Sequence, residues 1–154
     1  MSRLSSTLNA KLSPEIQAKY ESVTKSASGL AGLHEAIGQI DLEPWVTYTV
    51  ALTVAHEREN IALWDSFVPL AREAGVSEAV IDGIAAGTGP RGLLPKEGIW
   101  VHFAQEVLRD KMRDSTWVAT THLVGDEGAV ALALTACYYD MMARLNRTFA
   151  LEIA

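Results

Sequence analysis

The sequence predicts an all-α protein, and three observations support this fold class. Apolar residues recur at helical spacing, helix-starting residues and glycines bracket the apolar segments, and no alternating stretch bounded by turn residues predicts a strand. The 154 residues are 49% hydrophobic and 21% charged. This composition is typical of one globular domain and excludes a disordered or fibrous chain.

The first predicted helix begins at Ser13-Pro14, where serine is a good N-cap and proline suits the first helical position. It is expected to run to Ala27, and a short segment, Leu30–Ile37, follows it. Residues 1–43 are therefore interpreted as an N-terminal helical extension, and residues 44–154 as one helical unit.

The second main helix opens near Pro44, and from Trp45 to Ala55 it is apolar on almost every side. A helix that is apolar all round is a buried one. The cluster His56-Glu57-Arg58-Glu59 follows directly and marks the place where the chain emerges toward solvent or a cleft.

Asn60 is expected to cap the next helix, which ends at Gly75. Pro69 stands inside this helix and is expected to kink or restart it. The remaining helices are expected to begin at Ser77, at Pro95, at Asp114 (running to Leu123) and at Ala129 (running to Leu151), with Gly87–Gly92 as the clearest loop.

The charge balance and the cysteine count exclude several classes of protein. Thirteen basic and 19 acidic residues give a net charge of −6, which argues against a nucleic-acid partner. The single cysteine, Cys137, excludes an intrachain disulfide framework and a four-cysteine zinc site. The N-terminus shows no apolar signal region, and the longest uncharged runs fall short of the roughly 20 residues that a membrane span needs. We expect a cytoplasmic protein without a membrane partner.

The first candidate site lies at the end of the buried helix. His56 and Asn60 share a helical face, and His56-Glu57-x-x-Asn60 differs by one residue from the zinc motif His-Glu-x-x-His. Because asparagine is a poor zinc ligand, no metal is expected here. A polar helix terminus and a small-molecule site remain the two interpretations.

Three other features are interpreted as structural and not as functional sites. His102 and Glu106, four residues apart, are expected to form a solvated pair. Cys137 lies in an apolar run and is expected to be a small buried side chain. Of Tyr138 and Tyr139, one is expected in the core, and the other can reach a pocket or an interface.

Three stretches resemble the carboxymuconolactone decarboxylase and alkylhydroperoxidase-D-like family. They are Val50–Gly75, which contains Leu63-Trp64 and runs on to Val76-Ser77; Phe103–Asp110 together with Asp114–Trp117; and Tyr138–Asn146. In order and spacing they are similar to the family over about residues 44–150. The resemblance implies a compact multi-helix fold that assembles as a homotrimer or hexamer, with a dimer as the alternative.

The family pattern also implies where a pocket should lie. Peroxidase members carry a glutamate, a Cys-x-x-Cys pair and a histidine, and these positions correspond here to Tyr48, Asn60, Leu63 and Phe67. None of the four matches, although Trp64 keeps the tryptophan of related members. Thiol peroxidase chemistry, which needs a nucleophilic and a resolving thiol, is therefore not supported.

Two hypotheses remain open. The first is an enzyme that needs no cofactor and moves a proton on a small lactone or carboxylate. Its catalytic candidates are His56 and Glu59, with Tyr48 and Glu57 as further acids or bases and Arg58 or Arg91 to hold an anion; its pocket residues are Tyr48, Asn60, Leu63, Trp64 and Phe67. The second is a non-catalytic small-molecule-binding or structural homo-oligomer in which Leu63 and Phe67 fill the former reactive pocket.

Overall fold

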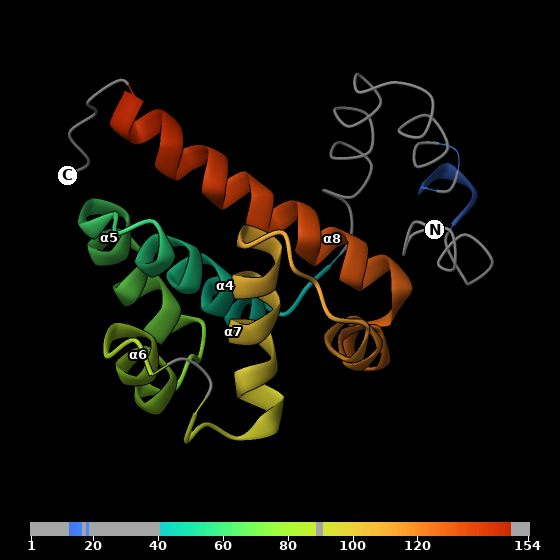
Figure 1. Ribbon diagram of the computed structural model, residues 1–154, viewed down its shortest axis with the longest axis horizontal. Helices are drawn as coiled ribbons and strands as arrows, with labels where there is room; N and C mark the ends of the chain where they lie inside the picture. Colours follow the sequence, from blue (N-terminus) through green and yellow to red (C-terminus); the bar gives the residue numbers. More distant parts are fainter. Residues whose placement is uncertain (1–12, 17, 19–40, 89–90, 149–154) are drawn as a thin grey trace.

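The computed structural model describes residues 13–16, 18, 41–88 and 91–148, and all regular structure within them is helical (Figure 1). The all-α prediction is confirmed. The helices beyond the first turn at Pro14 are α4 (Pro44–Glu57), α5 (Ile61–Glu73), α6 (Glu78–Ala85), α7 (Pro95–Leu108) and α8 (Asp114–Thr148).

The helix starts predicted near Ser13, Pro44, Asn60, Ser77, Pro95 and Asp114 are confirmed. Oγ of Ser13 accepts a hydrogen bond from the amide of Ile16 at 3.5 Å, and Oγ of Ser77 accepts one from the amide of Val80 at 3.3 Å. Pro44 and Pro95 stand in the first turns of α4 and α7, where no amide hydrogen is needed. The remainder of the helix expected to Ala27, the segment Leu30–Ile37 and the tip of the loop at residues 89–90 lie outside the described residues.

Helix α8 contains the break that the sequence predicts between its two last helices. Gly125 adopts φ 78° and ψ 172°, which is not helical, and the segments on either side run in different directions (Figure 1). The break is narrower than expected, because the residues after Gly125 are already helical. The predicted restart at Pro69 is wrong, since α5 continues through that residue. The predicted end at Leu151 lies outside the described residues.

Helix α4 is the centre of the molecule, as its apolar sequence predicts. It packs against α5, α6, α7 and α8, and Val50, Leu52 and Val54 are fully buried (Figure 1). The hydroxyls of two buried threonines, Thr49 and Thr53, donate to carbonyl oxygens four residues earlier at 2.7 and 2.8 Å. These bonds satisfy polar groups that a buried helix would otherwise leave unpaired.

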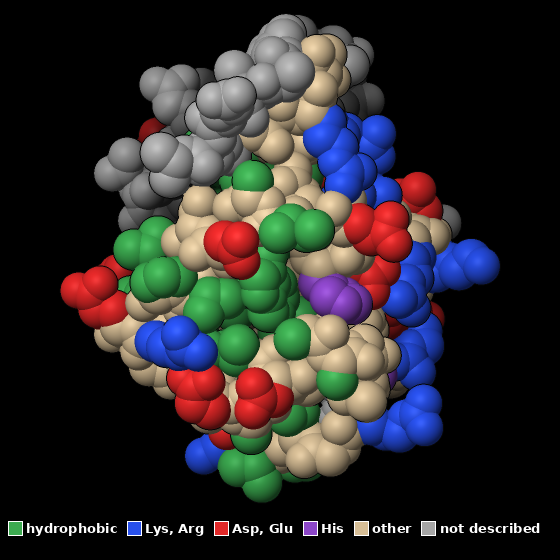
Figure 2. Space-filling view, turned by 90° about the vertical axis from the view of Figure 1, so that its left-hand side faces the viewer, with side chains coloured by type: hydrophobic (Ala, Val, Ile, Leu, Met, Phe, Trp, Pro, Cys, Tyr) green, Lys and Arg blue, Asp and Glu red, His purple; other side chains and the backbone are tan. Residues whose placement is uncertain are grey.

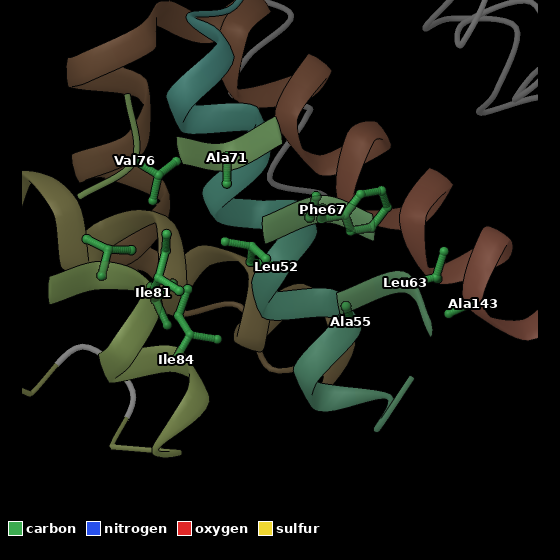
Figure 3. Packing of buried hydrophobic residues seen from close by; sticks show 12 residues of the cluster. Leu52, Ala55, Leu63, Phe67, Ala71, Val76, Ile81, Ile84 and Ala143 are labelled. Carbon is green, nitrogen blue, oxygen red and sulfur yellow. The ribbon is translucent and has the colours of Figure 1, made fainter. Parts of the chain in front are cut away.

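Among the described residues, two core clusters pack against α4. One cluster joins α4 to α5 and α6 around residues such as Leu52, Phe67 and Ile81 (Figure 3). The other joins α4 to α7 and α8 around Trp100 and Phe103. Among the helices that the structure describes, none has the combination of length and apolar character needed to cross a membrane.

Candidate functional site

The candidate site is built on the turn between α4 and α5. The amide of Glu59 donates to the carbonyl of His56 at 3.0 Å, and the amide of Asn60 donates to the carbonyl of Ala55 at 2.9 Å. These two hydrogen bonds are the pattern of a helix that ends in a left-handed residue, and Glu59 is that residue, with φ 51°. Glycine is the usual residue there, so Glu59 occupies a conformation that side chains disfavour.

The C-terminal part of α8 holds this turn in place. Nδ2 of Asn60 donates to Oδ1 of Asn146 at 3.1 Å and to the carbonyl of Ala143 at 3.5 Å. Oδ1 of Asn60 caps α5 by accepting from the amide of Leu63 at 3.1 Å, as the sequence predicts. The guanidinium of Arg147 donates to the carbonyl of Glu59. The side-chain amide of Asn60 therefore uses both its nitrogen and its oxygen to hold the turn in place.

A pocket of about 280 Å³ opens beside this turn. Its lining consists of Ala55, His56, Glu59, Asn60, Ile61, Trp64 and Ala85. Four of these, His56, Glu59, Asn60 and Trp64, are among the site residues that the sequence singles out. Ala85 comes from the end of α6, and nothing in the sequence signals its approach.

His56 is the polar side chain of the pocket best suited to proton transfer. Its imidazole makes no hydrogen bond within the described part of the chain, and it packs edge-on against Trp64, with ring centroids 6.1 Å apart. A Cβ added at Gly87 would lie 3.7 Å from Cε1 of His56, so the end of α6 closes one side of the imidazole.

Three of the predicted pocket residues lie elsewhere. Leu63 and Phe67 are 3% and 7% exposed and belong to the core cluster that joins α4 to α5 and α6 (Figure 3). Phe67 packs against Tyr139 of α8, with ring centroids 5.3 Å apart. Tyr48 packs against the same cluster. These side chains fill the interior and do not line the pocket at His56.

The charged neighbours of His56 are engaged with other helices. Glu57 accepts from Arg109 at 2.8 Å and from Gln105 at 3.3 Å, both on the α7 side. Arg58 pairs with Asp140 of α8, and this hydrogen bond raises the pKa of Arg58. Arg58 is thus committed to an ion pair, and Arg91, the other candidate for holding an anion, does not line the pocket.

The surface near α5 and α6 is apolar. In the view of Figure 2, hydrophobic side chains gather at the centre of this face, with a histidine at their edge and charged side chains around them. Ile61, at the mouth of the pocket, is 75% exposed. A small molecule bound at the pocket would therefore meet a mainly apolar surface.

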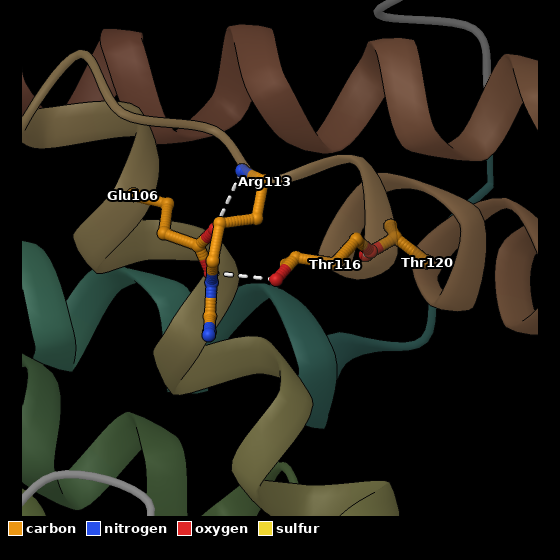
Figure 4. Close-up of polar contacts among 4 residues, drawn as sticks. All are labelled: Glu106, Arg113, Thr116 and Thr120. Atoms are coloured by element: carbon orange, nitrogen blue, oxygen red, sulfur yellow. Dashed lines mark hydrogen bonds and ion pairs between the residues drawn. The ribbon is translucent and has the colours of Figure 1, made fainter.

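The expected solvated pair of His102 and Glu106 is wrong. Glu106 is 8% exposed and accepts from the amide of Arg113 at 2.7 Å, from its Nε at 3.1 Å and from Oγ1 of Thr116 at 2.7 Å (Figure 4). Burial disfavours the charge, but these bonds outweigh it and lower the pKa of Glu106. For His102, burial and the nearby Arg113 lower the pKa. Spacing alone could not reveal a partner supplied by the loop after α7.

The prediction for Cys137 is also wrong, because the residue is exposed on α8. Packing around its sulfur, with Asp140 and Asp110 nearby, raises the pKa of the thiol. The prediction that one of the two tyrosines packs in the core is confirmed for Tyr139, and Tyr138 is exposed.

Within the described residues, no three histidine, cysteine, aspartate or glutamate side chains gather in a way that could hold a metal ion. Comparisons with family models, with curated proteins and with solved structures give no match to this chain.

Proposed function

We propose that this protein is a divergent enzyme of the carboxymuconolactone-decarboxylase-like type that moves a proton on a small lactone or carboxylate, with His56 as the acid or base. The observation that carries the proposal is the imidazole of His56, which lines an open pocket and makes no hydrogen bond within the described residues. Glu59 supplies a carboxylate at the same pocket. The reaction needs no metal or organic cofactor, because the imidazole itself donates and accepts the proton.

The chemistry follows from the lining. For a lactone that contains a carbon–carbon double bond, His56 removes a proton from a carbon in conjugation with the carbonyl, the C–H electrons form a dienolate, and the imidazolium returns the proton to a different carbon of that dienolate. For a carboxylate, the bond to CO₂ breaks, its electrons stay on carbon, and the imidazolium protonates that carbon. Trp64 and Ile61 give the pocket an apolar wall that limits the access of water to the intermediate.

The test is turnover of a panel of small lactones and carboxylates by the wild type and by His56→Gln. A positioned general acid or base contributes about 10²–10⁴-fold, so His56→Gln should lose at least 10²-fold in kcat/KM. His122→Gln is the matched control, because His122 is exposed on the first part of α8 and does not line the pocket. Equal turnover by the wild type and His56→Gln would refute the role of His56.

The alternative is a non-catalytic small-molecule-binding or structural homo-oligomer on the same fold. The burial of Leu63 and Phe67 in the core favours it, because these residues stand where peroxidase members of the resembled family carry a cysteine and a histidine. Binding at His56 that is detected by NMR, without turnover of any bound compound, would support this alternative. Light scattering on the full chain would then distinguish the proposed trimer or hexamer from a dimer or monomer. We place this oligomer in the cytoplasm.

A further inference from the structure

A second pocket, of about 350 Å³, lies where α4 and α7 begin and where α8 approaches its break. It shares no lining residue with the pocket at His56. Its lining consists of Asp41, Leu42, Glu43, Trp45, Val46, Lys96, Trp100, Leu123 and Val124. Only a little more than half of this wall is apolar, and it contains the indoles of two tryptophans.

Trp100 gives this pocket an unusual polar feature. Its side chain is almost fully buried, and Nε1 has no hydrogen-bond partner among the described residues. Trp45 packs edge-on against Trp100, with ring centroids 6.3 Å apart, but its own Nε1 is paired with the carboxylate of Glu43. A buried N–H without an acceptor is rare in proteins and destabilises the site that contains it. The indole of Trp100 therefore gains from any acceptor that enters the pocket.

The charged groups around the pocket are of both signs. Lys96 lines it and brings an ammonium group, and the positive ends of α4 and α7 meet there, since Pro44 and Pro95 are the first residues of these helices. Of the two carboxylates in the lining, Glu43 is already bound to Trp45, and Asp41 is exposed. Lys96 and the two helix N-termini are thus the positive groups that attract an oxygen acceptor, while the two carboxylates oppose a negatively charged one.

We propose that this second pocket binds a flat, largely apolar molecule through a carbonyl or carboxylate oxygen that accepts a hydrogen bond from Nε1 of Trp100. The ring of the ligand packs against Trp45, Val46 and Leu123, and Lys96 lies close enough to the same pocket to attract a charged oxygen. Because Nε1 is covered in the free protein, the oxygen reaches it after a small rotation of the lining side chains. An apolar cavity of about 150 Å³ is enough to hold benzene, so one substituted ring fits.

The experiment uses three probes of similar size: acetophenone, which has a carbonyl acceptor; ethylbenzene, which has none; and benzoate, which is charged. Titration of the ¹⁵N-labelled full chain follows the indole N–H signals of its four tryptophans, assigned by single Trp→Phe variants. We expect acetophenone and benzoate, but not ethylbenzene, to shift the Nε1 signal of Trp100 downfield. The Trp64 signal reports on the pocket at His56 and should stay unchanged.

Two variants separate the hydrogen bond from the charge. Trp100→Phe keeps an aromatic ring without the N–H and should reduce the preference for acetophenone over ethylbenzene by about fivefold to tenfold, as expected for one neutral hydrogen bond. Lys96→Gln, at an exposed position, should weaken benzoate and leave acetophenone unchanged. His56→Gln should alter neither, so the outcome does not depend on the proposed enzyme activity.

The proposal is overturned if none of the three probes shifts the Trp100 signal. It is also overturned if the preference for acetophenone over ethylbenzene is the same in Trp100→Phe as in the wild type. Should Trp100→Phe fail to fold, the downfield shift in the wild type and the effect of Lys96→Gln decide the question. A shift confined to Trp64 would assign the probes to the other pocket and would also overturn the proposal.

Discussion

Nδ2 of Asn60 donates a hydrogen bond to Oδ1 of Asn146 at 3.1 Å, across a separation of 86 residues. Both side chains are buried. The bond fixes the turn that carries His56 and Glu59 to the C-terminal part of α8, next to the contact between Arg147 and the carbonyl of Glu59. The geometry of the candidate site therefore depends on a helix that contributes no residue to the pocket lining.

Replacing Asn60 with alanine should be costly. Asn60→Ala removes the N-cap of α5 and the donor to Asn146, so we expect a loss of about 2–3 kcal/mol in the free energy of unfolding. Urea denaturation measures this loss. Ser77→Ala is the matched control, because Ser77 caps α6 and its other side-chain bond is exposed, and it should cost about 1 kcal/mol. Equal losses in the two variants would show that the bond to Asn146 contributes nothing.

Replacing the left-handed residues at two helix ends with glycine should stabilise the protein. Glu59 and Asp110 have φ 51° and 54°, where glycine is favoured. Glu59→Gly and Asp110→Gly should each raise the free energy of unfolding by about 1 kcal/mol, measured by urea denaturation. Asp110 lies outside the pocket, so only Glu59→Gly should alter ligand binding at His56. Destabilisation by Asp110→Gly would contradict the strain argument.

Glu106 should be a strong contributor to stability. In Glu106→Gln, the amide group replaces one oxygen of a buried carboxylate that accepts from Arg113 and Thr116, so a donor faces donors. We expect a loss of about 2 kcal/mol. Glu78→Gln is the control: its ion pair with Arg72 is exposed and screened by solvent, so its loss should destabilise the protein less than Glu106→Gln does. Thermal unfolding of both variants tests this ranking, and an equal effect would refute it.

The protein should lose stability in acid. Burial disfavours the charges of Glu106 and Asp140, but bonds from Arg113 and Thr116, and from Arg58 and Arg144, lower their pKa values below the usual range. At a pH between these lowered pKa values and the unfolded pKa values of about 4, the unfolded chain binds more protons than the folded protein does. Stability is therefore complete above about pH 4.3 and falls as the pH drops through this window. Urea denaturation from pH 3 to 7 should show a smaller decline in Glu106→Gln than in the wild type.

Cys137 should be a slow nucleophile. Packing around the sulfur and the nearby Asp140 raise the pKa of the thiol, so the reactive thiolate is scarce at neutral pH. Iodoacetamide at pH 7.5 should alkylate it more slowly than it alkylates free cysteine. Cys137→Ser should leave the rate of hydroperoxide consumption at the background level of the wild type. Peroxide consumption that disappears in Cys137→Ser would contradict our exclusion of thiol peroxidase chemistry.

Much of the helical architecture could be predicted because its signals are local. Serine, asparagine and proline mark helix starts by satisfying or omitting amide hydrogens, and the apolar sequence from Trp45 to Ala55 predicts the buried α4. Pro69 misled the prediction, because α5 tolerates it within an otherwise continuous helix. His56 and Glu59 line a pocket at the end of α4, where the sequence predicts that the chain emerges toward solvent or a cleft.

The tertiary structure decided which residues far apart in the sequence contact each other. The family resemblance grouped Leu63 and Phe67 with His56, but the packing of α5 against α4 and its neighbours directs these side chains into the core. Glu106 was paired with the wrong residue, because its partner comes from the loop after α7. The sequence by itself determined the helices, since capping and apolar periodicity act within a few residues. Which side chains share a pocket depends on how the helices pack, and only the folded chain contains that information.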